Sequence, residues 1–347
     1  MKKSKWNRRD FLKLSTAGLL GMAFRPFFGD GESLDGGEHL VRVAVNQVSI
    51  YKEPSDKSEI QFQVYRNDLL HVYYEKVAEE PKWNPLWYRV WGGWVHSAHM
   101  QTVQMKLNPV LSSVREGGQV MEVTVPYTRS MWYTKARGWE ENYLLYYGSN
   151  HWVVDIDAGP DGEPWYVIEN DLLRLNFFVP AEQLRAIPDG DLTPIRPEVP
   201  LGNKRIEIDI INQRLTAYEY NEVVLASKVS TGLLHRSSPN TVPLATPKGD
   251  FVIQSKMPSK HMGDGILTDD PEEYVLPGVP YVSFFQTEDG IAIHGTYWHT
   301  NYGIPMSHGC VNMINEEARF IYRWSAPYPD DPTRWHTQGY GTSVRVF

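Results

Sequence analysis

The 347-residue chain has very little cysteine: Cys310 is the only one, which excludes an intramolecular disulfide. One thiol is also a poor basis for a zinc site, which usually needs several thiolates or imidazoles. Basic residues are not in excess, since 34 Lys and Arg face 42 Asp and Glu. The formal net charge of −8 argues against nucleic acid as a partner. Cys310 is therefore a buried small side chain, an accident or a reactive nucleophile.

The composition is that of a folded, mainly β protein. Hydrophobic residues make up 41% of the chain, and the 12 Trp and 20 Tyr suit pleated surfaces. The 24 Pro and 27 Gly fit many short strands joined by turns. We therefore expect a mainly β chain with few helices, divided into two or three domains.

The first residues differ from the rest. "MKKSKWNRRDFLK" is basic and is followed by a mild apolar run that is shorter than the ~20 residues a membrane span needs. "RRDFLK" resembles a twin-arginine export signal. Residues 1–29 are therefore predicted to be an export signal and linker, which places the protein in the cell envelope, in the periplasm or cell wall. No small-residue cleavage motif follows Phe24, so membrane attachment through an uncleaved signal stays open.

Two front modules are expected before a Pro-rich linker. Residues 38–105 alternate short apolar runs with turns, and "WYRV…GGWV" at their end resembles the bacterial SH3-like barrel. The runs predict five strands: Val41–Val45, Ile60–Val64, Leu69–Tyr74, Trp87–Val90 and Gly93–Val95. Residues 106–198 are interpreted as a second SH3-like or irregular β module. "PDGDLTPIRPEVP" closes it as a semi-rigid linker.

The last domain is predicted over residues 200–347. Its strands alternate around "NQ", "YN" and "EDG" turns, and "NEEARFIYRWS" is its one convincing helix. Asn315 is the expected cap, and Ala318, Ile321 and Tyr322 share one face.

Residues with the chemistry of an activated thiol gather near Cys310. His294 closes the strand "GIAIHG", and His308 and Gly309 directly precede the cysteine in "SHGC". A free thiol is only slightly ionised at neutral pH, and a neighbouring imidazole can take its proton. Gly309 lets the backbone bend closely past the sulfur, and N–H groups after such a bend can hold an oxyanion.

"TPKGDF", "IAIHGT" and "SHGCVNM", in this order, resemble the catalytic domain of the L,D-transpeptidases, the YkuD family. The resemblance covers about residues 203–347 and implies a β-rich fold with Cys310 as nucleophile and His294 as general base. It implies that the carbonyl of Gly295 orients the imidazole. His308 and Ser307 would shape the pocket, and Asn312 would hold the loop that bears the cysteine. Residues 261–280 would be a lid.

The implied reaction is acyl transfer on peptidoglycan tetrapeptide stems, with loss of the terminal D-alanine and formation of 3-3 cross-links. Water as acceptor would make the enzyme an L,D-carboxypeptidase, and a lipoprotein lysine would make it an anchoring enzyme; the sequence leaves these open. The resemblance implies no cofactor and no metal, and we expect a monomer.

Three alternatives remain. His294, His299, His308 and Cys310 lie close enough in sequence to suggest zinc, although their spacing matches no recognised zinc pattern. A wall-binding protein with an inactive last domain is the second. The third, an NlpC-type cysteine hydrolase, is disfavoured because its cysteine precedes its histidine. The other histidines, His235, His261 and His336, are expected at the surface or in the lid.

Overall fold

The computed structural model describes residues 39–172, 175–233, 244–263, 275–331 and 335–347. The chain divides into two compact units, Met1–Ser33 and Leu34–Phe347, and every described residue belongs to the second. The predicted export signal lies outside the described residues. Within the described part, no helix is long and apolar enough to span a membrane. The fold is mainly β, as predicted.

The first module has eight strands rather than the five that the sequence pattern indicated. They form a three-stranded sheet, β4-β1-β8, and a five-stranded sheet, β3-β2-β7-β6-β5. Their side chains enclose a core that includes Val41, Ile50 and Val95. An SH3-like identity for this module stays a prediction. The bounds are β1 Leu40–Val43, β2 Gln47–Tyr51, β3 Ile60–Tyr65, β4 Leu69–His71, β5 Tyr74–Val77, β6 Leu86–Val90, β7 Gly93–His96, η1 Ser97–His99 and β8 Met100–Val103.

The middle module is one seven-stranded sheet in the order β11-β10-β14-β13-β12-β9-β15. Its neighbouring strands pair antiparallel, and its core includes Met121, Leu145 and Tyr166. The bounds are β9 Gln119–Val123, β10 Tyr127–Thr134, β11 Gly138–Tyr146, β12 Asn150–Ala158, β13 Pro164–Glu169, β14 Asn176–Pro180, η2 Ala181–Gln183, β15 Leu184–Ala186, η3 Asp189–Asp191 and η4 Leu201–Asn203.

The C-terminal module holds two five-stranded sheets, β18-β17-β16-β25-β19 and β23-β22-β21-β20-β24. The predicted hairpin turns are present, and Gln213, Tyr220 and Asn221 adopt positive φ at two of them. The bounds are β16 Lys204–Asp209, β17 Arg214–Glu219, β18 Glu222–Lys228, β19 Gly249–Val252, β20 Ser255–Gly263, β21 Val275–Gln286, β22 Ile291–Gly295, β23 Val311–Met313, α2 Asn315–Trp324, β24 Thr337–Gln338 and β25 Ser343–Val346.

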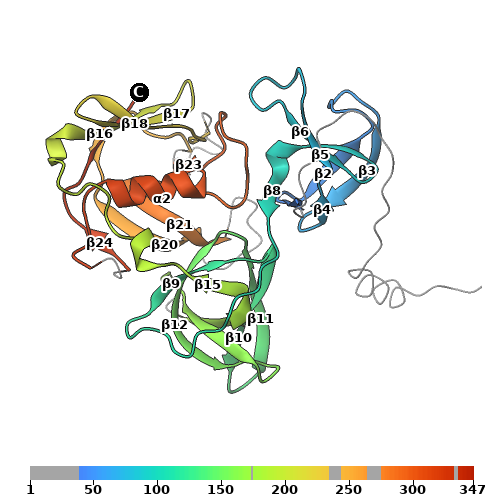
Figure 1. Ribbon diagram of the computed structural model, residues 1–347, viewed down its shortest axis with the longest axis horizontal. Helices are drawn as coiled ribbons and strands as arrows, with labels where there is room; N and C mark the ends of the chain where they lie inside the picture. Colours follow the sequence, from blue (N-terminus) through green and yellow to red (C-terminus); the bar gives the residue numbers. More distant parts are fainter. Residues whose placement is uncertain (1–38, 173–174, 234–243, 264–274, 332–334) are drawn as a thin grey trace, which may run out of the picture. The chain divides into compact units, whose positions relative to one another are not determined.

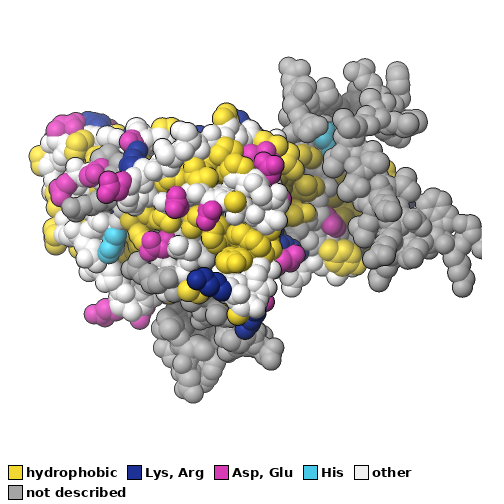
Figure 2. All heavy atoms as spheres, turned by 90° about the horizontal axis from the view of Figure 1, so that it is seen from below, with side chains coloured by type: hydrophobic (Ala, Val, Ile, Leu, Met, Phe, Trp, Pro, Cys, Tyr) yellow, Lys and Arg dark blue, Asp and Glu magenta, His cyan; other side chains and the backbone are white. Residues whose placement is uncertain are grey.

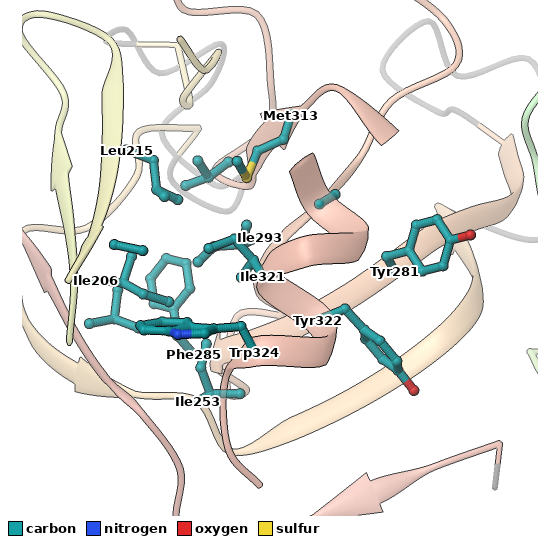
Figure 3. Close-up of a cluster of buried hydrophobic side chains, with 14 of the residues drawn as sticks. Ile206, Leu215, Ile253, Tyr281, Phe285, Ile293, Met313, Ile321, Tyr322 and Trp324 are labelled. Carbon is teal, nitrogen blue, oxygen red and sulfur yellow. The ribbon is translucent and has the colours of Figure 1, made fainter. Parts of the chain in front are cut away.

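Helix α2 joins these two sheets through a shared core. Figure 3 shows Ile321 and Trp324 of α2 near Ile206, Phe285 and Ile293 from both sheets. The buried face is the predicted one. The predicted cap is wrong: Ile314 occupies the N-cap position, and Asn315 is the first helical residue. The Asn315 amide donates to the Gly148 carbonyl in the middle module at 2.9 Å instead.

Two buried lysines donate hydrogen bonds to carbonyls at the C-terminal end of α2. Lys204 Nζ donates to the Trp324 carbonyl at 3.0 Å. Lys256 Nζ donates to the carbonyls of Tyr322 and Ser325 at 2.7 and 2.6 Å. The last carbonyls of a helix have no partner within the helix and carry partial negative charge, so ammonium groups stabilise them. In Figure 1 α2 lies over β21, and the two lysine contacts attach its C-terminal end to β16 and β20.

The middle and C-terminal modules share a hydrophobic core. Val120, Trp152, Ile187 and Leu192 belong to the same cluster as the side chains around α2. Trp152 also stacks on Trp335, with ring centroids 5.7 Å apart. The predicted boundary at residues 198–200 therefore lies between the strands of the two modules, but their hydrophobic side chains form one core across it.

The face in Figure 2 mixes hydrophobic, acidic and polar side chains, and its basic side chains are scattered. This pattern agrees with the acidic net charge. It offers no basic surface of the kind that phosphate backbones need on that face.

Candidate active site

Strand pairing brings Cys310 and His294 to one face. β22 and β23 run parallel, with Ile293 opposite Val311 and His294 opposite Asn312. Continuing this register places Cys310 opposite Ala292. Because side chains alternate along a strand, Ala292 and His294 point to the same side as Cys310 and Asn312. The parallel pairing therefore brings together two motifs that lie 16 residues apart in the sequence.

That face opens into a cavity of about 250 Å³. His294, Cys310 and Asn312 all line it, so it brings together the predicted nucleophile and base. The remaining wall comes from β20, β21 and the segment before the cysteine, with the lining residues Met262, Leu276, Trp298, Met306, Ser307 and His308. Of the predicted lid, residues 264–274 lie outside the described residues.

His294 is held as a neutral base. Its Nδ1 lies 2.8 Å from the Gly295 carbonyl, which can only accept, so Nδ1 carries the proton. Nε2 then has a free lone pair. Burial lowers the pKa of His294 to about 4, which keeps the ring uncharged at neutral pH. The contact with Gly295 is the one that the resemblance implied.

Gly295 has no room for a side chain. A Cβ atom there would lie 2.4 Å from Asn315 Oδ1 and 2.8 Å from Pro280 Cγ. The absence of a side chain therefore lets Asn315 of α2 and Pro280 of β21 pack directly against the Gly295 backbone, whose carbonyl accepts the His294 N–H.

Cys310 is a protonated thiol in the resting structure. Burial raises its pKa to about 11. Sγ lies 3.7 Å from the carbonyl of Gly290, the last residue of the hairpin turn before β22. Cys310 lies opposite Ala292, with Gly290 two residues before Ala292 and His294 two residues after it. Because Sγ contacts the Gly290 carbonyl, the thiol points away from His294 along the strand.

The loop before Cys310 is clamped by backbone and hydroxyl contacts. Ser307 Oγ donates to the Cys310 carbonyl. Gly309 adopts φ +108°, a conformation that side-chain-bearing residues rarely take. The N–H and carbonyl of Asn312 both pair with Ser230, at 2.9 and 3.0 Å. These contacts make the loop a fixed support for the thiol.

Thr246 is part of this clamp and was missed by the sequence reasoning. Its hydroxyl donates to the Gly309 carbonyl at 2.8 Å and accepts from the Gly232 N–H at the same distance. Thr246 opens the quoted "TPKGDF" motif, which was the available signal. His308, by contrast, is exposed at the cavity edge.

His299 is buried and contacts Asn312, which lines the cavity. Its Nδ1 accepts the Asn301 N–H at 3.2 Å, so the proton of the neutral ring is on Nε2. Burial lowers the pKa of His299 to about 3. Nε2 lies 2.9 Å from the Asn312 amide, so the amide oxygen is the atom that must face it. That orientation pairs Oδ1 and turns the NH₂ group away from His299.

The remaining histidines have separate surroundings. His336 is exposed and lies 2.7 Å from Ser255 Oγ. His261 is 4% exposed within β20, so it is not a surface residue; it is the first residue of the segment predicted to be the lid. His235 lies outside the described residues. Across the described ranges, no three His, Cys, Asp or Glu side chains are grouped as a metal site would need.

The geometry can be compared with known families. The family model YkuD, described as the L,D-transpeptidase catalytic domain, matches residues 203–346. This part of the chain is a YkuD-type catalytic domain. The match covers the C-terminal module and includes both cavity motifs. A search of curated proteins gave no match.

Solved structures similar to the chain are L,D-transpeptidases. One from Mycobacterium smegmatis is 20% identical, with 51% of this chain and 75% of that chain covered and a TM-score of 0.32. L,D-transpeptidase 3 from Mycobacterium tuberculosis, in complex with a faropenem-derived adduct, is 22% identical with coverages of 42% and 60% and a TM-score of 0.31. The E. faecium catalytic domain is 26% identical with coverages of 42% and 96% and a TM-score of 0.30. The assignment of residues 203–346 to a YkuD-type domain rests on the match of the family model and not on these TM-scores.

Proposed function

We propose that the protein is a cysteine-dependent L,D-transpeptidase that acts on peptidoglycan stem peptides. One observation carries the proposal: within the YkuD-type domain, Cys310 and His294 face the same cavity from adjacent parallel strands. His294 presents a neutral Nε2 lone pair, which suits a general base.

The first step is acylation of the thiol. Rotation about the Cα–Cβ bond of Cys310 turns Sγ from Gly290 towards His294, between staggered rotamers. The thiol proton passes to Nε2 as Sγ attacks the carbonyl that precedes the terminal D-alanine. Backbone N–H groups at Gly309 and Cys310 are the proposed donors to the oxyanion. The C–N bond then breaks, His294 returns the proton to the leaving amine, and a thioester remains.

The second step transfers the acyl group. An amine of a neighbouring stem loses a proton to His294 and attacks the thioester carbonyl. The C–S bond breaks, Cys310 recovers the proton, and a 3-3 cross-link results. Water in place of the amine would give a tripeptide, and a protein lysine would give an anchored protein.

Proton transfer must accompany attack because both groups rest in their neutral forms. Burial raises the pKa of Cys310 to about 11 and lowers the pKa of His294 to about 4, so a preformed thiolate–imidazolium pair is disfavoured. Positioning of the two groups in one cavity then becomes the main requirement.

The remaining assignments extend this proposal. Export through the twin-arginine route would deliver the enzyme to the cell envelope, where stem peptides occur. The first module would bind the wall as an SH3-like domain, and Ser307 and His308 would contact the stem at the cavity edge.

Labelling tests the nucleophile. A carbapenem should add one adduct mass to the intact protein, because ring opening acylates Cys310. Cys310→Ala should gain none while keeping the same melting temperature. An adduct on Cys310→Ala, or none on the folded parent protein, would contradict the assignment.

Turnover tests the reaction. Incubation with a disaccharide-tetrapeptide should give a dimer lighter by one D-alanine, detected by mass spectrometry. A tripeptide alone would identify a carboxypeptidase. Neither product from folded protein, across stems with different third residues, would refute peptidoglycan acyl transfer.

A further inference from the structure

Two strands that form part of the cavity wall, β20 and β21, also contact the middle module. Met262 of β20 and Leu276 of β21 pair directly and both line the cavity. They also pack in the cluster that contains Cys310 and Trp298. We call β20 residues 258–262 and β21 residues 276–279 the wall strands. Their position sets the width of the space beside the thiol.

The wall strands rest on β12 of the middle module. Asn150 Nδ2 donates to the Pro258 carbonyl at 3.0 Å, and Ser259 Oγ donates to the Asn150 carbonyl. Gly278 has φ +72°, and a Cβ atom there would lie 2.3 Å from His151 Cε1. The backbone of β21 is therefore in direct contact with β12, and no side chain fits between them.

A bulge in β21 shapes this contact. Lys260 pairs with Val279 and Met262 with Leu276, so β21 has one extra residue within Pro277–Gly278. The Pro277 carbonyl accepts the Tyr297 hydroxyl at 2.8 Å, from the segment that follows the catalytic histidine. Tyr297 thus holds the bulge at the Pro277 carbonyl, and His151 packs against it at Gly278.

A polar clamp at the end of β13 holds the other wall strand. Asp171 Oδ1 accepts the His261 N–H at 2.8 Å, and Asp171 Oδ2 accepts from Lys260 Nζ. Asn170 Nδ2 lies 2.9 Å from His261 Nδ1. Burial lowers the pKa of His261 to about 4, so the neutral ring accepts this bond. All three contacts fall within two residues of Met262.

We propose that Asn170 and Asp171 are positioning residues of the acyl-transfer site, through which the middle module holds the wall strands against the cavity. The inference rests on the proposed function for its substrate, a peptidoglycan stem. The working catalytic unit is then residues 106–347, although the family match covers residues 203–346. Small displacements of a substrate-positioning wall can cost about a hundredfold in rate.

Thiol reagents of different size test the wall directly. Asp171→Ala removes the acceptor of both β20 contacts, so the wall strands should move away from Cys310. Alkylation by N-phenylmaleimide, relative to alkylation by iodoacetamide, should then rise about threefold or more, because a wider cavity favours the bulky reagent. Stem-peptide KM should rise about tenfold, with a smaller change in kcat.

Matched variants separate positioning from stability. Asp157→Ala removes an exposed aspartate of the same module whose carboxylate bonds only the adjacent Ala158 N–H, and should change neither readout. Asp171→Asn keeps an acceptor for His261 but loses the charge opposite Lys260, so it should lie between wild type and Asp171→Ala. It also serves if Asp171→Ala does not fold.

The outcomes are distinguishable. An unchanged reagent ratio in both Asp171 variants, matching Asp157→Ala, would overturn the positioning role. If the parent protein turns over no stem peptide, the proposed function fails, but the reagent ratio still decides whether Asp171 controls the cavity.

Discussion

The ionisation of Cys310 is the sharpest testable consequence of the structure. Burial raises the thiol pKa from 9.0 to about 11. That increase in pKa corresponds to roughly 3 kcal/mol against the thiolate. At pH 8 the thiolate fraction falls about a hundredfold, but a more basic thiolate is more nucleophilic by about eightfold. The folded thiol should therefore react about tenfold more slowly than an ordinary one.

Alkylation by iodoacetamide measures this without interference, because Cys310 is the only cysteine. Rates from intact mass, taken from pH 6 to 10.5, should keep rising through pH 9.5 in the folded protein. The same protein in guanidinium chloride should level off near the ordinary thiol pKa. The pH at which the alkylation rate levels off reports the thiol pKa. Limited access of iodoacetamide to Cys310 would lower the rate at every pH by the same factor and leave that pH unchanged.

A folded-state plateau below pH 8 would refute the reasoning. It would mean that the thiolate is already formed at neutral pH, stabilised by a charged His294. In that case His294→Asn should abolish the plateau. If the resting groups are neutral, as the structure indicates, His294→Asn should leave the profile rising through pH 9.5 while turnover is lost.

Three further predictions follow. Gly278→Ala should lower the free energy of unfolding by more than about 3 kcal/mol in chemical denaturation, because both φ +72° and the contact with His151 oppose a side chain there. The control Gly162→Ala has φ +82° but lies in open space, so it should cost about 1 kcal/mol. Equal costs for the two variants would contradict the close packing at Gly278. Acid should lower the melting temperature as pH falls from about 6.5 to 4, because four buried histidines stay neutral in the folded protein and become protonated in the unfolded chain. Each fully titrating ring should lower the free energy of unfolding by about 1.4 kcal/mol per pH unit. A melting temperature that does not change with pH would argue against the neutrality of these rings. The four are His151, His261, His294 and His299. Nitrogen-15 NMR should find the His299 proton on Nε2, and a proton on Nδ1 would reverse the Asn312 amide orientation.

Local patterns predicted the parts of the fold that depend on neighbouring residues. The buried face of α2 was visible because its apolar residues recur with the helical period. The turns at Gln213 and at Tyr220–Asn221 were visible because their residue types suit tight hairpins. The Asn315 cap failed because its amide is used by Gly148, a partner in another module.

The front strands show the same limit. β2, β5 and β8 were not predicted, and their runs are short or weakly alternating. A five-residue strand gains its stability from partners across the sheet, so its own sequence carries little signal. The choice of partner is a tertiary matter.

The site divides in the same way. The pairing of Cys310 with His294 could be predicted from residue type and motif order, and the contact of His294 with the Gly295 carbonyl from the family resemblance. Thr246 lies 63 residues from the Gly309 carbonyl it contacts, and Asp171 lies 89 residues from Lys260, so no local pattern connects them. Their roles arise only when distant strands pack together.

By itself, the sequence determined a mainly β chain with one cysteine and predicted His294 as its partner, because residue type and alternation are local properties. Only the tertiary structure decided that burial favours the neutral forms of both groups, that β22 and β23 run parallel, and that the middle module contacts the cavity wall. Burial and strand pairing depend on what surrounds a residue in space, and that is set by packing across the whole chain.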